Sequence, residues 1–289
     1  DNPHYEQDKQ IWRTNWRSRL RSLIGAVDPR VPPVLSVIAD PSDVAADADP
    51  QSRPAVQAVR WNVLEGVTAE GLLLLPAGEV TGYAVAIPDA SWTPEMFCGL
   101  AEGVAAESQL PLRLVERGVV VLVPMLISRD DEFSGHPDIR YTNIPHREFV
   151  YRMSFELGRH IIGYEVQKVL AGVDVLQQMA GGAEENVTIG LCGVGDGGQL
   201  AMYAAAIGDH HGPTLTCGYF SHRHNVWQEP IDRNIWKFLR GLSDAHVACL
   251  AATNGLMIVE ASEAPPFAGP RPFRDKRPDF AAPGTISTP

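Results

Sequence analysis

The sequence is short of the features that mark several common classes of protein. Its apolar runs all fall below the roughly 18–20 residues that a membrane-spanning helix needs. Its four cysteines are widely spaced and form no C-x-x-C pattern, so neither a disulfide framework nor a cysteine-bound metal is expected. Positive charge is also scarce: 24 Lys and Arg face 35 Asp and Glu, and the net charge of −11 argues against nucleic acid or an anionic membrane surface as a partner. What remains is a soluble globular chain of 289 residues, long enough for one α/β domain.

The first residue leaves the compartment open. Asp1 is not an initiator methionine, so the sequence has been processed or trimmed, or is a piece of a longer one. A mature N-terminus at Asp1 would indicate an exported or periplasmic protein, and otherwise the chain is expected in the cytoplasm.

The stretch 186–207, NVTIGLCGVGDGGQLAMYAAAI, carries the strongest local pattern in the chain. Val187–Cys192 is apolar and β-branched, which predicts a buried strand. Gln199–Ile207 is rich in Ala, Leu and Met, which predicts a buried helix. Four glycines in six residues lie between them, so we expect a tight turn in which backbone approaches backbone closely.

This turn resembles the nucleophile elbow of the α/β-hydrolases, whose pattern is G-x-S-x-G. Gly193 and Gly197 match the outer glycines, and Gly198 matches an extra glycine common in esterase-like members. Where the serine should stand the chain has Gly195, which has no side chain that could attack a substrate. The resemblance therefore implies the frame of an elbow without its nucleophile.

The order of elements predicts an α/β fold. An antiparallel start is followed by alternating strands and helices, which gives a mostly parallel sheet with helices on both faces, the α/β-hydrolase fold, without an obvious final strand and helix. Strands are predicted at 56–64, 69–75, 81–87, 119–123, 187–192, 214–220 and 256–261. Helices are predicted within 94–117 and over 148–179, 199–207 and 231–242.

The composition divides the chain into three parts. Residues 1–54 read as an amphipathic basic helix, packed on the protein as an arm, and a connector over Asp28–Pro54 that is rich in Pro, Asp and Ala. Residues 55–263 form the α/β-hydrolase-like domain. Residues 264–289 are dense in proline and without periodicity, as in a linker or extended tail.

Three longer stretches, 144–176, 193–206 and 218–236, resemble the N-terminal half of large bacterial proteins of the dienelactone hydrolase and acetylxylan esterase-like group. The resemblance covers residues 15–289. In that group the turn often reads Gly-x-Gly-Glu-Gly-Gly, with an acid where Asp196 stands here, and a second hydrolase domain with a serine elbow follows. The resemblance implies that Gly195 is native and that a companion hydrolase domain is the partner.

A serine-type triad is also missing its base. In this fold the order along the chain is Ser, Asp or Glu, then His. The predicted strand 256–261 would carry the acid, with Glu260 or Glu263 near its end, but the last histidine is His246. Nucleophile and base are therefore both expected to be absent from this chain.

Asp196 is the acidic candidate at the turn. It follows the nucleophile position, where the backbone N–H normally helps to form an oxyanion hole, and the helix dipole would favour its carboxylate. A helix-capping aspartate is the simpler interpretation. An Asp nucleophile would have to stand at 195.

The stretch 221–229, SHRHNVWQE, follows a predicted strand at its carboxyl end, where open α/β sheets bind ligands. His222 and His224 are candidates for a base or for metal ligands, and Trp227 and Glu229 line the same stretch. Two histidines at i and i+2 are a weak metal signal, so structural histidines are the alternative and neither a metal nor a cofactor is expected.

Four more charged residues are expected to line a cleft at this edge: Asp89, Arg129, Asp130 and Arg147. Opposite charges at spacings of three and four along 147–165 favour a solvated, salt-bridged helix face. An arginine cluster against a partner domain is the alternative.

These observations favour a degenerate esterase-like or acetylxylan esterase-like domain, a structural or substrate-positioning half of a larger hydrolase directed at an ester or carbohydrate. One alternative is an active hydrolase in which Asp196 and His222 or His224 activate water. Another is a pure assembly protein, whose helical arm and proline-rich tail bind neighbours.

Overall fold

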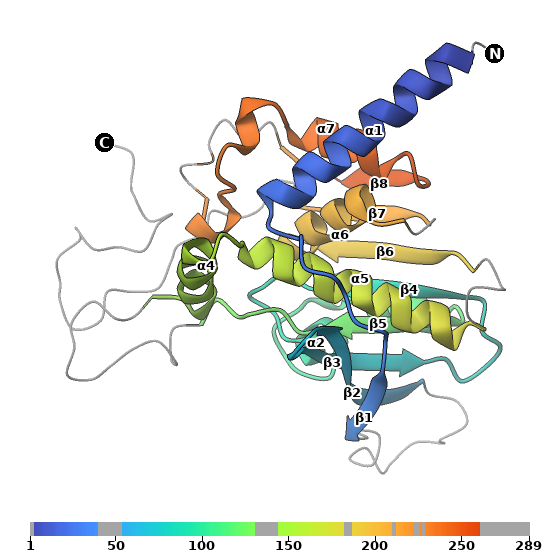
Figure 1. Ribbon diagram of the computed structural model, residues 1–289. Coiled ribbons are helices and arrows are strands. Elements are labelled where there is room, and N and C mark those ends of the chain that lie inside the picture. The colour runs from blue at the N-terminus through green and yellow to red at the C-terminus, as the bar shows by residue number, and fades with distance from the viewer. Residues whose placement is uncertain are drawn as a thin grey trace, which may run out of the picture.

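The computed structural model describes residues 3–39, 54–130, 144–181, 187–209, 212–221, 223, 226 and 229–260. The strands in this part of the chain are β1 (Leu35–Ala39), β2 (Ala55–Leu64), β3 (Val67–Leu75), β4 (Gly82–Ile87), β5 (Val119–Pro124), β6 (Ile189–Val194), β7 (Thr214–Cys217) and β8 (Met257–Glu260). They form one eight-stranded sheet in the order β1-β2-β3-β5-β4-β6-β7-β8 (Figure 1). The pairs β1–β2, β2–β3 and β3–β5 are antiparallel, and the rest of the sheet is parallel, as the sequence predicts.

Helices cover both faces of the sheet. Those described are α1 (Pro3–Leu23), α2 (Pro94–Phe97), α3 (Leu110–Val115), α4 (His146–Glu156), α5 (Ile161–Met179), α6 (Asp196–Ile207) and α7 (Asp244–Ala251). The larger core joins one face of the sheet to α1, α5, α6 and α7. The smaller core joins the other face to α2 and α3. The middle of the sheet is therefore dry on both sides, which explains the continuous apolar sequence of β5.

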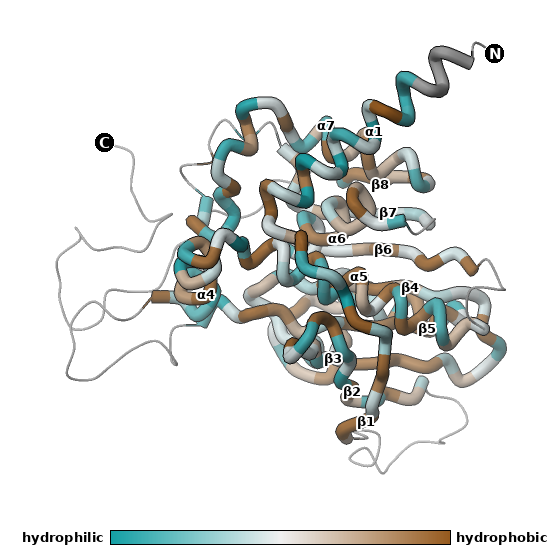
Figure 2. The backbone as a smooth tube through the Cα atoms, viewed as in Figure 1, coloured by the Kyte–Doolittle hydropathy of each residue, from teal (hydrophilic) through white to brown (hydrophobic). Residues whose placement is uncertain are grey.

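The first helix is attached to the protein through its C-terminal half. Leu20 and, just after the helix, Ile24 are fully buried, whereas Ile11 is 52% exposed. Figure 2 shows hydrophilic and hydrophobic residues alternating along α1, and Figure 1 shows its N-terminal end projecting past α6 and α7. The predicted packed helix is present. The predicted connector, however, contains β1, an edge strand that its neighbouring prolines obscured in the sequence.

The long helix predicted over 148–179 is two helices. Between α4 and α5 the chain turns at Gly158, whose φ of +65° is unfavourable for other residues. His160 then caps α5, because its Nδ1 accepts the backbone N–H of Ile162 at 3.1 Å. The sequence-based prediction missed this break because the pattern of opposite charges continues on both sides of Gly158.

The prediction of a helix over 231–242 is wrong. Only two short 3₁₀ turns form there, Ile231–Arg233 and Phe238–Arg240, and α7 begins after them. Lys237, with φ +62°, interrupts the segment. Asp232 is buried and Arg233 largely so, in ion pairs with distant elements, so tertiary contacts override the local helical preference here.

Candidate functional site

A single residue separates strand β6 from helix α6. Gly195 has φ +56° and ψ −119°, and its N–H donates to the carbonyl of Cys217 at 2.9 Å. This backbone conformation is strained for any residue with a side chain. We call Val194–Asp196 the glycine turn.

Close backbone approach explains the flanking glycines. A Cβ added to Gly193 would collide with the carbonyl of Gly197, and a Cβ on Gly197 would collide with the carbonyl of Ile87 at the end of β4. Each position therefore requires glycine for steric reasons alone, as the spacing of the motif predicts.

The carboxylate of Asp89 lies over Gly195. Because Ile87 of β4 pairs with Gly193 of β6, Asp89 stands beside the glycine turn. A Cβ added to Gly195 would collide with Asp89 Oδ2. The same oxygen accepts the backbone N–H of Asp196 at 3.1 Å, and Oδ1 accepts the N–H of Ser91 at 2.9 Å. The space beside the glycine turn is therefore filled by the protein's own anion.

Asp196, the first residue of α6, is fully buried between two arginines. Its Oδ2 accepts from Arg129 Nη2 at 2.7 Å, and its Oδ1 accepts from Arg233 Nε at 2.5 Å. Burial alone would raise the pKa of Asp196, but the charges of Arg233, Arg129 and Arg147 hold the pKa well below its usual range. The carboxylate is therefore a permanent anion.

The ion pairs continue away from the turn. Asp232 accepts from Arg129 Nη1 at 3.0 Å and from Arg147 Nε at 2.6 Å. Arg147 also lies 2.6 Å from Glu165, at Nη2 and Oε2, and both side chains are fully buried. Glu165 in turn accepts the backbone N–H of Ile127 at 3.0 Å. These contacts connect four parts of the chain to the glycine turn: the segment after β5, helix α4, helix α5 and the 3₁₀ turn Ile231–Arg233.

We call this group the buried ion network. Its members are Arg129, Arg147, Glu165, Asp196, Asp232 and Arg233. Three arginines face three carboxylates, so the charges balance. Each member's charge is compensated only while the others stay in place, which makes the network a rigid support for the turn.

The structure brings four of the predicted site residues together. Asp89, Asp196, Arg129 and Arg147 meet around the glycine turn, with Arg233 Nη2 also 3.9 Å from Asp89 Oδ2. The prediction of a solvated face for the segment that starts at Arg147 is wrong at that residue, because its guanidinium is completely buried. Helical charge spacing says which side chains share a face but not whether that face meets water.

Other predicted residues lie apart from this group. Asp130 is exposed, and its backbone carbonyl accepts the N–H of His146 at 2.7 Å. Glu260 ends β8, and its carbonyl accepts the N–H of Gly218 at 3.0 Å. Glu229 lies 3.2 Å from Arg223. The remaining predictions, His222, His224, Trp227, Glu263 and the tail over 264–289, fall outside the described residues.

Sequence reasoning missed Asp232 and Arg233. Their only signal was membership of the stretch 218–236, which carries the family resemblance. A buried Asp-Arg dipeptide in a predicted surface helix has no local mark that distinguishes it from an exposed pair. Its role appears only once residues 37 and 103 positions away in sequence meet it.

A second polar cluster is buried between the sheet end and α7. Arg223 donates to the hydroxyl of Tyr219, and its Nη1 lies 4.0 Å from Asp244 Oδ1. Burial raises the pKa of Asp244 to about 6 and also raises the pKa of Glu229, while Arg223 opposes both shifts. Burial therefore disfavours the charged forms of Asp244 and Glu229, whereas the arginines around Asp196 favour its charged form.

The described residues offer little other ligand chemistry. Among them no three His, Cys, Asp or Glu side chains gather as a metal site. In the same part of the chain no helix is long and apolar enough to cross a membrane. At the glycine turn the side chain of Asp196 is hydrogen-bonded to arginines, which give it no means of passing a proton at neutral pH.

No protein-family model matches the sequence, and no curated protein is detectably similar to it. Solved structures are similar in fold. A Bacteroides fragilis protein assigned as an acetyl xylan esterase superposes with a TM-score of 0.62 at 13% identity, over 86% of this chain and 67% of that one. A glucuronoyl esterase from Solibacter usitatus gives a TM-score of 0.53 at 13% identity, over 89% of this chain and 76% of that one. The chain therefore has the α/β-hydrolase fold.

Proposed function

We propose that this chain is an α/β-hydrolase domain that has lost its nucleophile and serves as a structural or substrate-positioning half of a larger ester- or carbohydrate-directed hydrolase. One observation carries the proposal. The position that holds a catalytic side chain in an elbow is Gly195, and the carboxylate of Asp89 fills the space beside it.

The hydrogen bond to Asp89 supports this further. In serine hydrolases of this fold the N–H after the nucleophile helps to stabilise the developing oxyanion. Here that N–H, on Asp196, is already donated to the Asp89 carboxylate. A fixed negative charge at this place repels a second one, so it opposes the transition state of acyl transfer.

The alternative of an unorthodox hydrolase needs a base whose pKa lies near neutrality. The pKa of Asp196 is shifted in the opposite direction, because Arg233 and Arg129 stabilise its anion. An anion held by two arginines is a poor proton acceptor at pH 7. This weighs against water activation at the glycine turn by Asp196.

The assembly alternative has an observation in its favour. Helix α4 carries Phe149 and Met153 with about half of their surfaces exposed, and Leu157 just beyond it is 71% exposed. Exposed apolar side chains at i, i+4 and i+8 lie along one side of a helix and are typical of a surface that meets another protein. A companion domain in contact with this helix would agree both with the proposed degenerate hydrolase domain and with an assembly protein.

The test compares three proteins with p-nitrophenyl acetate and a serine-directed fluorophosphonate probe: the native chain, Gly195→Ser, and the double variant Asp89→Ala with Gly195→Ser. We expect the native chain to be inert and unlabelled. We expect the double variant to label more than the single one, because removing Asp89 frees both the space and the Asp196 N–H. Gly78→Ser, at a turn with no atom near its Cβ, controls for unspecific labelling.

Ester turnover by the native chain that Asp196→Asn abolishes would contradict the proposal and support the unorthodox hydrolase. Equal labelling of the Gly195→Ser and Gly78→Ser proteins, with or without Asp89, would show that no oxyanion frame survives.

A further inference from the structure

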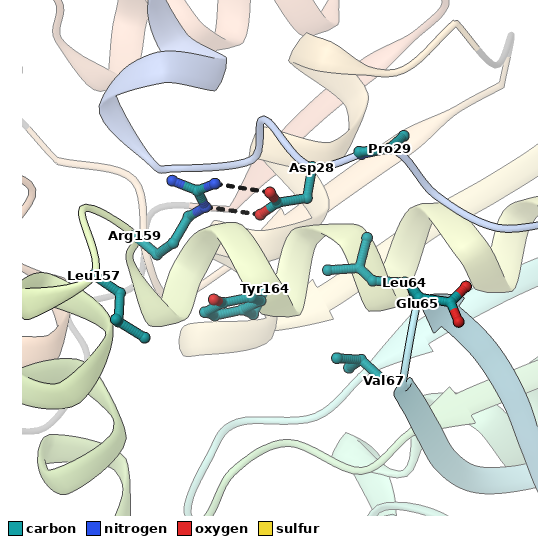
Figure 3. A pocket seen from close by; sticks show the side chains of 8 residues that line it. All are labelled: Asp28, Pro29, Leu64, Glu65, Val67, Leu157, Arg159 and Tyr164. Atoms are coloured by element: carbon teal, nitrogen blue, oxygen red, sulfur yellow. Dashed lines mark hydrogen bonds and ion pairs between the residues drawn. The ribbon is translucent and has the colours of Figure 1, made fainter.

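A pocket of about 440 Å³ opens beside the N-terminal end of α5 (Figure 3). Its walls come from the chain after α1, the β2–β3 turn and the turn between α4 and α5. This volume lies within the range of roughly 300–1,000 Å³ that is usual for small-molecule sites.

The pocket lies at the same edge of the sheet as the glycine turn. Gly71, in the middle of β3, pairs with Pro124 at the carboxyl end of β5, so the first residues of β3 extend beyond that end, and β5 runs parallel to β4. The β2–β3 turn therefore extends from the edge at which the parallel strands end. Open α/β sheets bind their ligands outside this edge.

The lining of the pocket combines two facing apolar walls with a polar pair beside them. Figure 3 shows Leu64 and Val67 facing Tyr164 and Leu157 across the opening, with the Arg159–Asp28 pair above them. Arg159 donates from Nε and Nη2 to the two carboxylate oxygens of Asp28, both at 2.7 Å. A ligand that fills this space must present apolar groups to both walls and hydrogen-bonding groups toward the Arg159–Asp28 pair.

The charges at the pocket disfavour an anionic ligand. Arg159 is neutralised by Asp28, whose pKa the hydrogen bond from Arg159 holds below its usual value. Glu65 adds a further carboxylate at the β2–β3 turn, so the charged residues of the lining sum to −1. A neutral group that both donates and accepts hydrogen bonds suits these carboxylates and the guanidinium better than an acid does.

We propose that this pocket binds a neutral saccharide. One sugar ring lies between Tyr164 on one wall and Leu64 and Val67 on the other, with its C–H groups toward both walls, and its hydroxyl groups bond to the Asp28–Arg159 pair. The inference deepens the proposed function, on which it rests for the expectation that the sugar belongs to a polysaccharide. It assigns substrate positioning to a place separate from the filled glycine turn.

The test is titration of the native chain with xylotriose, followed by calorimetry and by ligand-observed NMR. We expect Tyr164→Ala to weaken binding about tenfold or more, because the aromatic contact is lost. Tyr164→Phe keeps the ring and the packing, so it retains most of the affinity. Trp236→Ala is the matched control, since Trp236 is 69% exposed but lines none of this pocket. Circular dichroism verifies that each variant folds.

Glucuronic acid and the neutral apolar fluorophore N-phenyl-1-naphthylamine are the comparison probes. We expect glucuronic acid not to bind to the native chain and to bind detectably to Glu65→Gln, because one repelling charge is removed. Absence of xylotriose binding, or equal binding by the native and Tyr164→Ala proteins, would overturn the proposal. If the fluorophore binds in this pocket and xylotriose does not, the proposal is overturned, and an apolar side chain of a protein partner becomes the expected occupant. None of these results depends on ester hydrolysis at Gly195, so each proposal fails separately.

Discussion

Two arginine–carboxylate groups stand at the same edge of the sheet and differ in their access to water. In the buried ion network the side chains of Arg147 and Glu165 are completely buried. In the pocket the side chains of Arg159 and Asp28 are 29% and 33% exposed. The pairs use similar contact distances, so geometry alone does not separate them.

The difference lies in what each group is available to do. A buried charge is compensated only by its fixed partners, so the network contributes to the fold, and its fully buried Arg147 and Glu165 side chains lie out of reach of a ligand. An exposed pair is already screened by water, which a polar ligand replaces with little loss. The glycine turn is therefore held closed by its surroundings, while the pocket stays open to small molecules.

The largest test of this comparison is Arg147→Ala. The change leaves Glu165 and Asp232 buried without a main partner, which we expect to lower the free energy of unfolding by about 3–5 kcal/mol. Urea denaturation measures it. The control is Arg30→Ala, which removes a pair with Asp174 whose side chains are 31% and 37% exposed and should lower the free energy of unfolding by about 0.2–1 kcal/mol. Similar losses in the two variants would break the comparison.

The pH dependence of stability tests the burial of His160, which caps α5 between the buried ion network and the pocket. Burial lowers its pKa from 6.5 to about 4, although the carbonyl of Asn234 opposes the shift. The folded state therefore binds fewer protons than the unfolded state, and the stability from neutral His160 is complete above pH 6.5 and lost as the pH falls toward 4. The full loss is about 3 kcal/mol.

The measurement is the free energy of unfolding of the native chain and His160→Asn between pH 8 and pH 4.5. Asn keeps a helix-capping oxygen but does not titrate. Asp244, with a pKa raised by burial to about 6, acts with the opposite sign in this range, so the quantity of interest is the difference between the two proteins. Parallel pH profiles would show that His160 is not desolvated.

Gly195→Ala tests how tightly Asp89 closes the glycine turn. The added Cβ meets Asp89 and a positive φ, so we expect a loss of about 1–3 kcal/mol. Combining it with Asp89→Ala should recover about 1 kcal/mol or more of that loss, because the two side chains compete for one space. Thermal and urea unfolding of both variants and the double variant measure the coupling. Purely additive losses would contradict the contact, and Gly78→Ala, whose Cβ meets no neighbour, is the control.

The smallest expected effect is that of Arg159→Ala. Loss of a partly exposed pair with Asp28 should lower the free energy of unfolding by about 0.2–1 kcal/mol, and added salt should reduce the difference. Urea denaturation at low and high salt measures it. A loss as large as that of Arg147→Ala would mean that the pocket is part of the structural core.

The sequence predicted most of the sheet because burial leaves a local mark. The apolar run of β5 and the alternation of buried and more exposed residues over 59–63 in β2 follow directly from which side chains meet the core. The glycine turn was also predictable, since collisions at Gly193 and Gly197 allow no other residue there. Strand β1 and the absence of a helix over 231–242 were not, because each depends on neighbours distant in sequence. The break at Gly158 has local causes, its positive φ and the His160 cap, but the continuous charge pattern concealed them.

The site divides along the same line. The sequence by itself determined that Gly195 has no nucleophile and that a strand runs directly into a helix around it, because glycine chemistry and apolar periodicity are local properties. Only the tertiary structure decided that Asp89 closes the turn and that Arg147 is buried in an ion network. The physical reason is that the sequence does not distinguish an exposed charged side chain from a buried one, because the partners of a buried charge come from strands and turns that only folding brings together.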